Sequence, residues 1–283
     1  SVTLSEKFLF MKIKCGLIVS DFDGTLITTK QQVPGRVRSA IERYVESGGI
    51  FAVCTGRMLA SILPQVRALG LKGLVAAYQG TVIADIESGK LIRCGGFKVD
   101  ESCEICRTLE ERGEAINAYA DNLMYTTLPA DDKLLNIYEE ITGVRAHHIS
   151  GKMSDYIKNN SLFCQKIVSV VMPENKLPLY NYLSAALGDK YEVTYSASVL
   201  VEVSPKGDDK GEALKFLAEH YNIPIENTVA VGDNLNDLPM ILAAGTGVAV
   251  ENAVEEFKKH ADDICPSCDD GGVADVIEKY GLE

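Results

Sequence analysis

The sequence predicts an α/β fold in which a doubly wound, mostly parallel sheet is interrupted by an inserted α+β domain. Near both ends of the chain, short apolar runs alternate with segments of helical period, which is the pattern of a parallel sheet with crossover helices. Between these regions, strand patterns follow one another through hairpin-like turns. The chain of 283 residues also exceeds a typical domain of roughly 100–150 residues, which favours two domains.

The change of pattern sets the expected domain boundaries. Residues 11–82 and 205–283 are expected to form the α/β core, and residues 83–204 the inserted α+β domain. Residues 1–10 have an apolar run too short for a signal-peptide core and no helical or strand period, so we expect a leader or tag-like segment. No apolar run approaches the roughly 20 residues of a membrane span, so no membrane partner is expected, and the lack of an export signal favours the cytoplasm.

The first core strand is predicted at the apolar run Cys15–Ser20, which ends on two carboxylates, Asp21 and Asp23. In open α/β sheets, ligands bind beyond the carboxyl ends of the strands, so chemistry is expected at these acids. Two acids this close repel each other unless a cation or a shared proton compensates. A solvated turn is the alternative for this segment, because Asp and Gly are common turn residues.

The next core elements are a helix after Pro34, a strand at residues 50–54, a helix over residues 58–69 and a strand at residues 74–77. The tripeptide Thr55-Gly56-Arg57 follows the second strand. A hydroxyl group and free backbone N–H groups at a helix start can hold an anion there. An ordinary helix N-cap is the alternative for Thr55.

The inserted domain is predicted to mix helices and strands. Asp121-Asn122 is expected to form a tight turn between two strands. His147 and His148 stand in a polar stretch and are expected at the surface. The predicted strands span residues 115–120, 123–127, 166–172, 192–195 and 200–203, and the predicted helices span residues 100–112, 131–141 and 177–187.

The eight cysteines are expected to be reduced thiols. Cys103 with Cys106, and Cys265 with Cys268, each have the spacing of half a zinc site. The two pairs are far apart in the chain, and the first lies on a helical stretch where cysteine serves as a small buried hydrophobe. We expect two separate structural pairs, with a zinc site as the alternative.

The return to the core brings further charged residues to the same sheet edge. Lys210-Gly211 opens a predicted helix, and a lysine at a helix N-terminus favours an anionic partner because it opposes the macrodipole; Lys206 is the alternative cation. A strand over residues 228–231 ends at Asp233, and Asp237 follows one helical turn later. Such a cluster of acids suits Mg²⁺, which prefers hard oxygen ligands. The last predicted elements are a strand over residues 247–250 and helices over residues 252–259 and 272–280.

Four segments resemble, in order, the motifs of the haloacid dehalogenase superfamily of phosphohydrolases. They are Asp21-Phe22-Asp23-Gly24-Thr25-Leu26, Thr55-Gly56-Arg57, Lys210-Gly211 and Gly232-Asp233-Asn234-Leu235-Asn236-Asp237, the last in a form typical of the Cof-type branch. The resemblance implies a Rossmann-like core whose inserted cap domain covers the active site and sets substrate specificity. Gln79 stands where the family usually has Asn, and the segment between Gly80 and Ser204 matches no motif.

The resemblance also implies a phosphatase that hydrolyses small phosphate monoesters with Mg²⁺ through an aspartyl-phosphate. Asp21 would be the nucleophile, Asp23 the acid and then the base, and Lys210 the catalytic cation. Mg²⁺ would be held by Asp21, Asp233 and the backbone carbonyl of Asp23. Asp237 would orient Lys210 or a metal-bound water. The residues expected to bind the phosphoryl group are Thr55, Gly56, Arg57 and Asn236.

Two other functions are compatible with these motifs. A phosphomutase of the same superfamily would pass the phosphoryl group to a sugar instead of water, and a non-enzymatic phosphoacceptor module would stop at a phosphoaspartate. Neither Asp23 nor a large insert has a use in a mere acceptor. The expected partner is a small phosphorylated metabolite, with sugar phosphates first and pyridoxal phosphate or flavin-related phosphates also compatible. A formal charge of −12 disfavours a nucleic-acid partner, and no oligomeric state is assigned.

Overall fold

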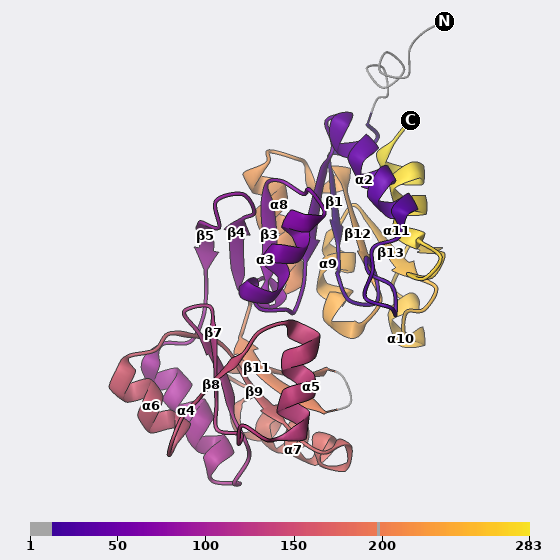
Figure 1. Ribbon diagram of the computed structural model, residues 1–283. Helices are drawn as coiled ribbons and strands as arrows, with labels where there is room; N and C mark the ends of the chain where they lie inside the picture. Colours follow the sequence, from indigo (N-terminus) through magenta and orange to yellow (C-terminus); the bar gives the residue numbers. More distant parts are fainter. Residues whose placement is uncertain (1–12, 197–198) are drawn as a thin grey trace, which may run out of the picture. The chain divides into compact units, whose positions relative to one another are not determined.

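The computed structural model describes residues 13–196 and 199–283, which divide into two compact units (Figure 1). The core unit comprises the described residues up to Gly56 together with Gln65–Ile92 and Asp209–Glu283. The second unit comprises Arg57–Pro64 and Arg93–Asp208. Each unit is built around one sheet of its own.

The larger sheet is mostly parallel and has β1 (Leu17–Ser20) at its centre. β1 pairs in parallel with β12 on one side and with β2 on the other, so that Leu17 lies opposite both Thr228 and Ile50. Every residue of β1 is buried, which is why the strand is apolar along its whole length. Among the described residues, the strand order is β14 (Asp263–Cys265), β13 (Thr246–Val250), β12 (Thr228–Gly232), β1, β2 (Ile50–Cys54), β3 (Leu74–Ala77), β4 (Val82–Asp85) and β5 (Leu91–Cys94).

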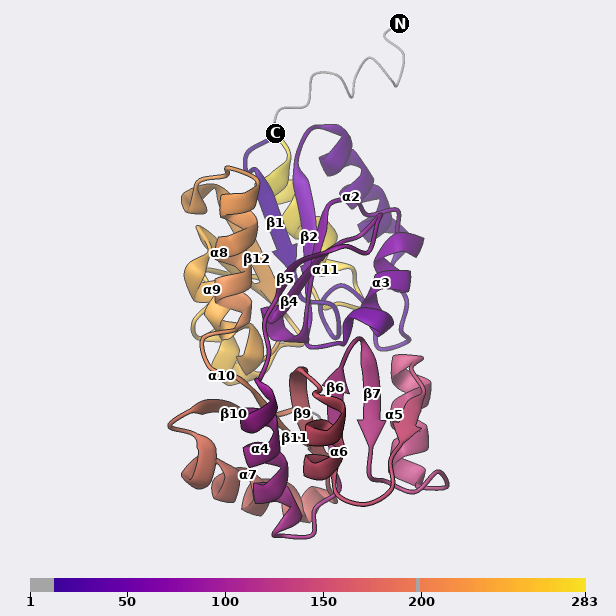
Figure 2. The same cartoon turned by 90° about the vertical axis from the view of Figure 1, so that its left-hand side faces the viewer.

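Helices cover both faces of this sheet, which confirms the doubly wound α/β class. Figure 2 shows α8 (Lys210–His220) and α9 (Leu238–Ala243) on one side of the strands and α2 (Gly35–Glu46) on the other. α11 (Gly272–Val276) packs against α2. The remaining α-helices among the described residues of this part of the chain are α3 (Leu59–Ala68), whose residues are divided between the two units after Pro64, and α10 (Glu255–Lys258).

The α2 helix shows how sequence pattern and packing agree. It follows Pro34, and its buried residues Val37, Ala40, Ile41 and Tyr44 recur at helical spacing. Gly48 follows two residues after the helix with φ +95°, a left-handed conformation that costs glycine little. One apolar stripe therefore faces the sheet, as expected from the sequence.

The second unit contains a mixed sheet with helices packed on it. In the described part of the chain, its strand order is β10 (Tyr191–Ser196), β11 (Leu200–Pro205), β9 (Cys164–Val170), β6 (Asn117–Ala120), β7 (Leu123–Thr126) and β8 (Ala146–His148). The helices are α4 (Val99–Glu110), α5 (Lys133–Thr142), α6 (Met153–Asn160) and α7 (Pro173–Leu187). Asp121 and Asn122 have φ values of +52° and +59° between β6 and β7, which confirms the expected tight turn. His147 and His148 are exposed, as expected.

Some elements differ from the sequence expectations. β4 and β5, which fall wholly or mostly within the range expected for the inserted domain, extend the larger sheet beside β3. β8, β14 and α6 were not predicted, and each is short. No helix in the described ranges is both long enough and apolar enough to cross a bilayer.

Candidate functional site

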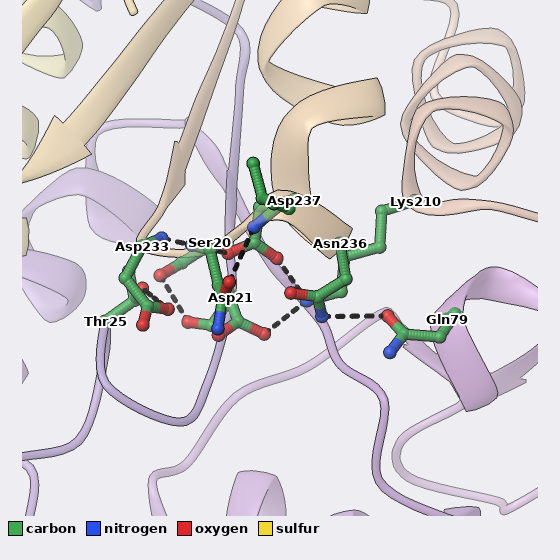
Figure 3. A network of polar contacts seen from close by, with 10 residues as sticks. Ser20, Asp21, Thr25, Gln79, Lys210, Asp233, Asn236 and Asp237 are labelled. Atoms are coloured by element: carbon green, nitrogen blue, oxygen red, sulfur yellow. Dashed lines mark hydrogen bonds and ion pairs between the residues drawn. The ribbon is translucent and has the colours of Figure 1, made fainter. Parts of the chain in front are cut away.

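The parallel pairing of β1 and β12 brings the acidic residues after each strand to the same edge of the sheet (Figure 3). The backbone N–H of Asp21 donates to the carbonyl of Val231 at 2.9 Å, which extends the ladder by one residue beyond β1. Asp21 is buried, with only 8% of its side chain exposed. Asp233 follows β12 directly and is half-buried.

Lys210 is the cation of this cluster. It is the first residue of α8, where the Asp209 side chain caps the helix by accepting from the backbone N–H of Glu212 at 2.9 Å. The fully buried Nζ of Lys210 lies 2.5 Å from Oδ1 of Asp21 and 2.5 Å from Oδ1 of Asp237. Lys206, the alternative cation, instead donates to the carbonyls of Gly188 and Asp189 in the second unit.

Asp237 links Lys210 to the loop that follows β12. Its Oδ2 accepts from the backbone N–H groups of Asp233 at 2.9 Å and Asn234 at 3.1 Å. Since Oδ1 accepts from Lys210, both carboxylate oxygens of Asp237 are committed to hydrogen bonds within the cluster. The packing here is also tight: a Cβ atom on Gly232 would lie 2.6 Å from the Cβ of Asp237, so only glycine fits at the end of β12.

The charges of the cluster do not balance. Burial, followed by repulsion from Asp237, raises the pKa of Asp21 well above its ordinary value, and the same causes raise the pKa of Asp233 to about 6. Burial by itself would lower the pKa of Lys210, but the carboxylates of Asp21 and Asp237 outweigh it and raise that pKa. Three carboxylates thus face one ammonium group.

This imbalance fits a bound divalent cation. Within the described residues, Asp21, Asp233 and Asp237 form the one group whose ligand atoms lie close enough to hold a metal, all within 4.8 Å of one another. Since Asp237 is committed to Lys210 and the loop backbone, Asp21 and Asp233 are the better oxygen donors. Carboxylate oxygens are the ligands that Mg²⁺ prefers, so the residues present fit that ion.

Two residues of this region were not predicted to belong to the site. Thr25 donates from its hydroxyl to Oδ1 of Asp233 at 3.0 Å, and Gln79 accepts from Nδ2 of Asn236 at 3.2 Å (Figure 3). The backbone N–H of Gln79 also donates to the carbonyl of Thr55 at 2.9 Å. Gln79 has φ +60° in the turn after β3, and its place beyond a strand end is the signal that could have found it.

The remaining predicted residues lie in different surroundings. Thr55 is buried at the end of β2, and Gly56 follows it close to the Gln79 amide. Asp23 and Asn236 are exposed. Arg57 belongs to the second unit, and its role stays a prediction.

Comparison with known proteins decides the family. The family model for haloacid dehalogenase-like hydrolases matches residues 18–277, which is most of the chain. The chain belongs to the haloacid dehalogenase-like hydrolases. This confirms the resemblance carried by the four motifs, including its Cof-type form.

Similar members of this haloacid dehalogenase-like family are phosphatases. The phosphatase YwpJ of Bacillus subtilis is 29% identical over 284 residues, covering 93% of this chain and 98% of that protein. The 5-amino-6-(5-phospho-D-ribitylamino)uracil phosphatase YwtE of the same organism is 28% identical over 298 residues, covering 94% of this chain and 98% of that protein. A haloacid dehalogenase-like hydrolase from Bacteroides thetaiotaomicron has a similar solved structure, with a TM-score of 0.83, 28% identity, and coverage of 94% of this chain and 99% of that chain. The protein is accordingly a phosphatase of phosphoric monoesters.

The cysteine pairs are not part of the acidic cluster. All eight cysteines are free thiols, and Cys103 with Cys106 lie in the second unit, whereas Cys265 with Cys268 lie in the core unit. Burial raises the pKa of the Cys106 and Cys265 thiols, the latter to about 12. Neutral thiols of this kind are poor metal ligands and poor nucleophiles.

Proposed function

We propose that the protein hydrolyses small phosphate monoesters with Mg²⁺ and that Asp21 becomes transiently phosphorylated. The observation that carries this proposal is the buried cluster of Asp21, Asp233 and Asp237 around Lys210 at the carboxyl edge of the core sheet. A structural ion pair needs no third carboxylate, so the excess negative charge is best explained by a bound cation, which could in turn hold a phosphoryl group.

In the first step, a carboxylate oxygen of Asp21 attacks phosphorus. A new O–P bond forms as the O–P bond to the leaving group breaks, and the leaving alkoxide takes a proton from Asp23. Lys210 favours the ionised form of Asp21 and holds its Oδ1 in place. Asp237, which contacts Lys210 from the other side, positions that ammonium group.

In the second step, water replaces Asp21 on phosphorus. Asp23 takes a proton from the water as it attacks, the O–P bond to Asp21 breaks, and inorganic phosphate leaves. The exposure of Asp23 is consistent with a group that exchanges its proton between steps, whereas the burial of Asp21 keeps the nucleophile poorly solvated. Both residues end the cycle in their starting protonation states.

The phosphoryl oxygens need positive charge and hydrogen-bond donors. Mg²⁺, held by Asp21, Asp233 and the backbone carbonyl of Asp23, would neutralise charge on the phosphoryl group. We assign the phosphoryl contacts to Thr55, Gly56, Arg57 and Asn236. The Gln79 contact to Asn236 supports this assignment, since it fixes an otherwise exposed amide beside the backbone of Thr55.

For the substrate we propose a small phosphorylated metabolite, with sugar phosphates first. The names of two relatives support a small metabolite: one is a 5-amino-6-(5-phospho-D-ribitylamino)uracil phosphatase and another, from Serratia proteamaculans, is an HMP-PP phosphatase. Substrate specificity would reside in the second unit, in which Arg57 is the one residue that belongs to any of the four motifs.

A panel of phosphate esters tests the proposal. We expect phosphate release over many turnovers from at least one sugar phosphate, loss of release when a chelator removes Mg²⁺, and recovery when Mg²⁺ is restored. Asp21→Asn, which keeps the shape of the side chain but not its nucleophilic oxygen pair, should remove turnover. Transfer of phosphate within a sugar without release would instead identify a phosphomutase, and a single stable phosphorylation would identify a phosphoacceptor module.

A further inference from the structure

The amide of Asn252 connects two loops that meet beside the acidic cluster. Asn252 lies in the turn between β13 and α10, and its Nδ2 donates to the carbonyl of Gly24 at 2.8 Å. Its Oδ1 accepts from the backbone N–H of Cys268 at 2.8 Å. The residue is exposed, and water would ordinarily satisfy such an amide; here both ends are committed to backbone groups of other loops.

The Gly24 peptide lies directly against the carboxylate of Asp233. Gly24 has φ +76°, and a Cβ atom there would lie 2.8 Å from Oδ2 of Asp233. The next residue, Thr25, donates from its hydroxyl to the other oxygen, Oδ1. The orientation of the Gly24-Thr25 segment therefore decides where the Asp233 carboxylate can lie.

The turn that carries Asn252 also holds the backbone of Asp233. The N–H of Val254 donates to the carbonyl of Asp233 at 3.0 Å. This one turn thus forms hydrogen bonds with two loops. One is the loop that follows β1 and Asp21, and the other is the loop that follows β12 and carries Asp233. It fixes the two loops relative to each other by hydrogen bonds to one carbonyl in each.

We propose that Asn252 is a positioning residue that sets the separation of the Asp21 and Asp233 carboxylates for Mg²⁺ by holding the Gly24 carbonyl. The proposal rests on the proposed function insofar as these two acids are taken as the ligands. Residues that orient metal ligands typically contribute 10–100-fold to metal affinity. The exposure of Asn252 places its expected effect near the lower end of that range.

The test is Mg²⁺ binding by the full, metal-free protein, measured by titration calorimetry without substrate. For Asn252→Ala we expect a Mg²⁺ dissociation constant about tenfold higher than that of the wild type. Activity measured over a range of Mg²⁺ concentrations should agree, with a larger change in the Mg²⁺ concentration needed for half-maximal rate than in KM for the ester. Wild-type Mg²⁺ affinity in Asn252→Ala would overturn the proposal.

Asp269→Ala is the matched control. Asp269 holds the same loop further along, through bonds from the N–H of Thr29 at 2.8 Å and its hydroxyl at 3.0 and 2.9 Å, but it does not touch Gly24. We expect lower thermal stability, because hydrogen bonds to a charged group are lost, with a Mg²⁺ dissociation constant within about twofold of the wild type. If both variants lost Mg²⁺ affinity equally, Asn252 would only stabilise the loop in general, and its proposed specific role would be overturned. A wild-type protein that neither binds Mg²⁺ nor releases phosphate would contradict the proposed function itself.

Discussion

Asp21 and Asp23 are separated by one residue, yet their surroundings differ. Asp21 is buried against Lys210, whereas Asp23 is exposed. Burial suits Asp21 as a poorly solvated nucleophile, and exposure suits Asp23 as a group that exchanges protons with the leaving group and with water. The two roles can therefore be separated by substitution.

Asp23→Asn should trap the phosphorylated enzyme. The substitution leaves the backbone carbonyl in place and gives a side chain of similar shape. Attack by Asp21 on p-nitrophenyl phosphate should therefore survive, because this leaving group needs little protonation. General acid–base catalysis typically contributes 10²–10⁴-fold, so turnover of alkyl phosphates should fall by about that factor. Quenched-flow measurement should show a burst of nitrophenol of about one per active site and then slow turnover.

The comparison of aryl and alkyl esters is the control for Asp23. Equal rate losses for both esters, with no accumulated phosphoenzyme, would remove Asp23 from the acid–base role. The assignment of Asp21 as the nucleophile would not be affected by that result.

Asp233→Ala should abolish turnover chiefly through the loss of Mg²⁺. Mg²⁺ is usually held by only one or two carboxylates, so removing one leaves too few charged ligands. Calorimetric titration should show a Mg²⁺ affinity so low that adding Mg²⁺ does not restore activity. Unchanged Mg²⁺ affinity would show that Asp233 is not a ligand.

The raised pKa of Asp233 predicts how metal and pH act on stability. In the metal-free protein this pKa is about 6, against an ordinary value of 3.8, because of burial and the nearby Asp237. A carboxyl group whose pKa is raised by folding contributes stability below its unfolded pKa and loses it as the pH rises through its folded pKa. Added Mg²⁺ should therefore raise the melting temperature more at about pH 7.5 than at about pH 5. Differential scanning calorimetry checks this, and Asp233→Asn should reduce the difference.

At the scale of elements, the start of α8 depends on a close contact with α9. A Cβ atom on Gly211 would lie 2.6 Å from the carbonyl oxygen of Pro239. Gly211→Ala should therefore push the two helices apart, at a cost of about 1–3 kcal/mol, and move the neighbouring Lys210 away from Asp21. Chemical denaturation and phosphatase assays should both show a loss. Gly35→Ala is the control, because nothing lies within 4 Å of its Cβ position at the start of α2, and it should change neither.

The elements that could be predicted are those with a clear period or a fully buried run. The segments that form β1, β2, β3, β12 and β13 are apolar because both faces of the core sheet are covered. β14 could not be found in this way, since it is three residues long and Ile264 in its middle is 52% exposed. The pairing of β4 with β3 could not be predicted either, because an apolar pattern shows that a strand exists but not which sheet accepts it.

The same contrast applies to the site. Asp21, Lys210 and Asp233 follow recognisable strand ends or helix starts, so topology predicts their meeting, and the structure brings them together with Asp237. Asn252 instead contacts Gly24 across two loops, and the meeting of these loops depends on the pairing of the whole sheet. Local sequence carries no signal for a contact such as that of Asn252 with Gly24.

At the scale of the whole molecule, the cysteines are expected to be structural. The two pairs at zinc-like spacing belong to different units, and burial raises the pKa of Cys106 and Cys265. We predict that metal analysis of the purified protein finds no stoichiometric zinc. One tightly held zinc ion per chain would contradict this prediction, and replacing Cys265 and Cys268 by Ser would then show whether that pair holds the ion.

The pairing of β1 with β12 has a consequence for synthesis of the chain. Leu17 pairs with Thr228, so about 200 residues must be made after β1 before this neighbour exists, which takes about 10–40 s at 5–20 residues per second. The continuous stretch 93–208 leaves the ribosome in between and can fold first. Until then the strand that leads to Asp21 has β2 as its neighbour on one side and an open apolar edge on the other. The central strand of the sheet therefore keeps one unpaired edge until β12 has been synthesised.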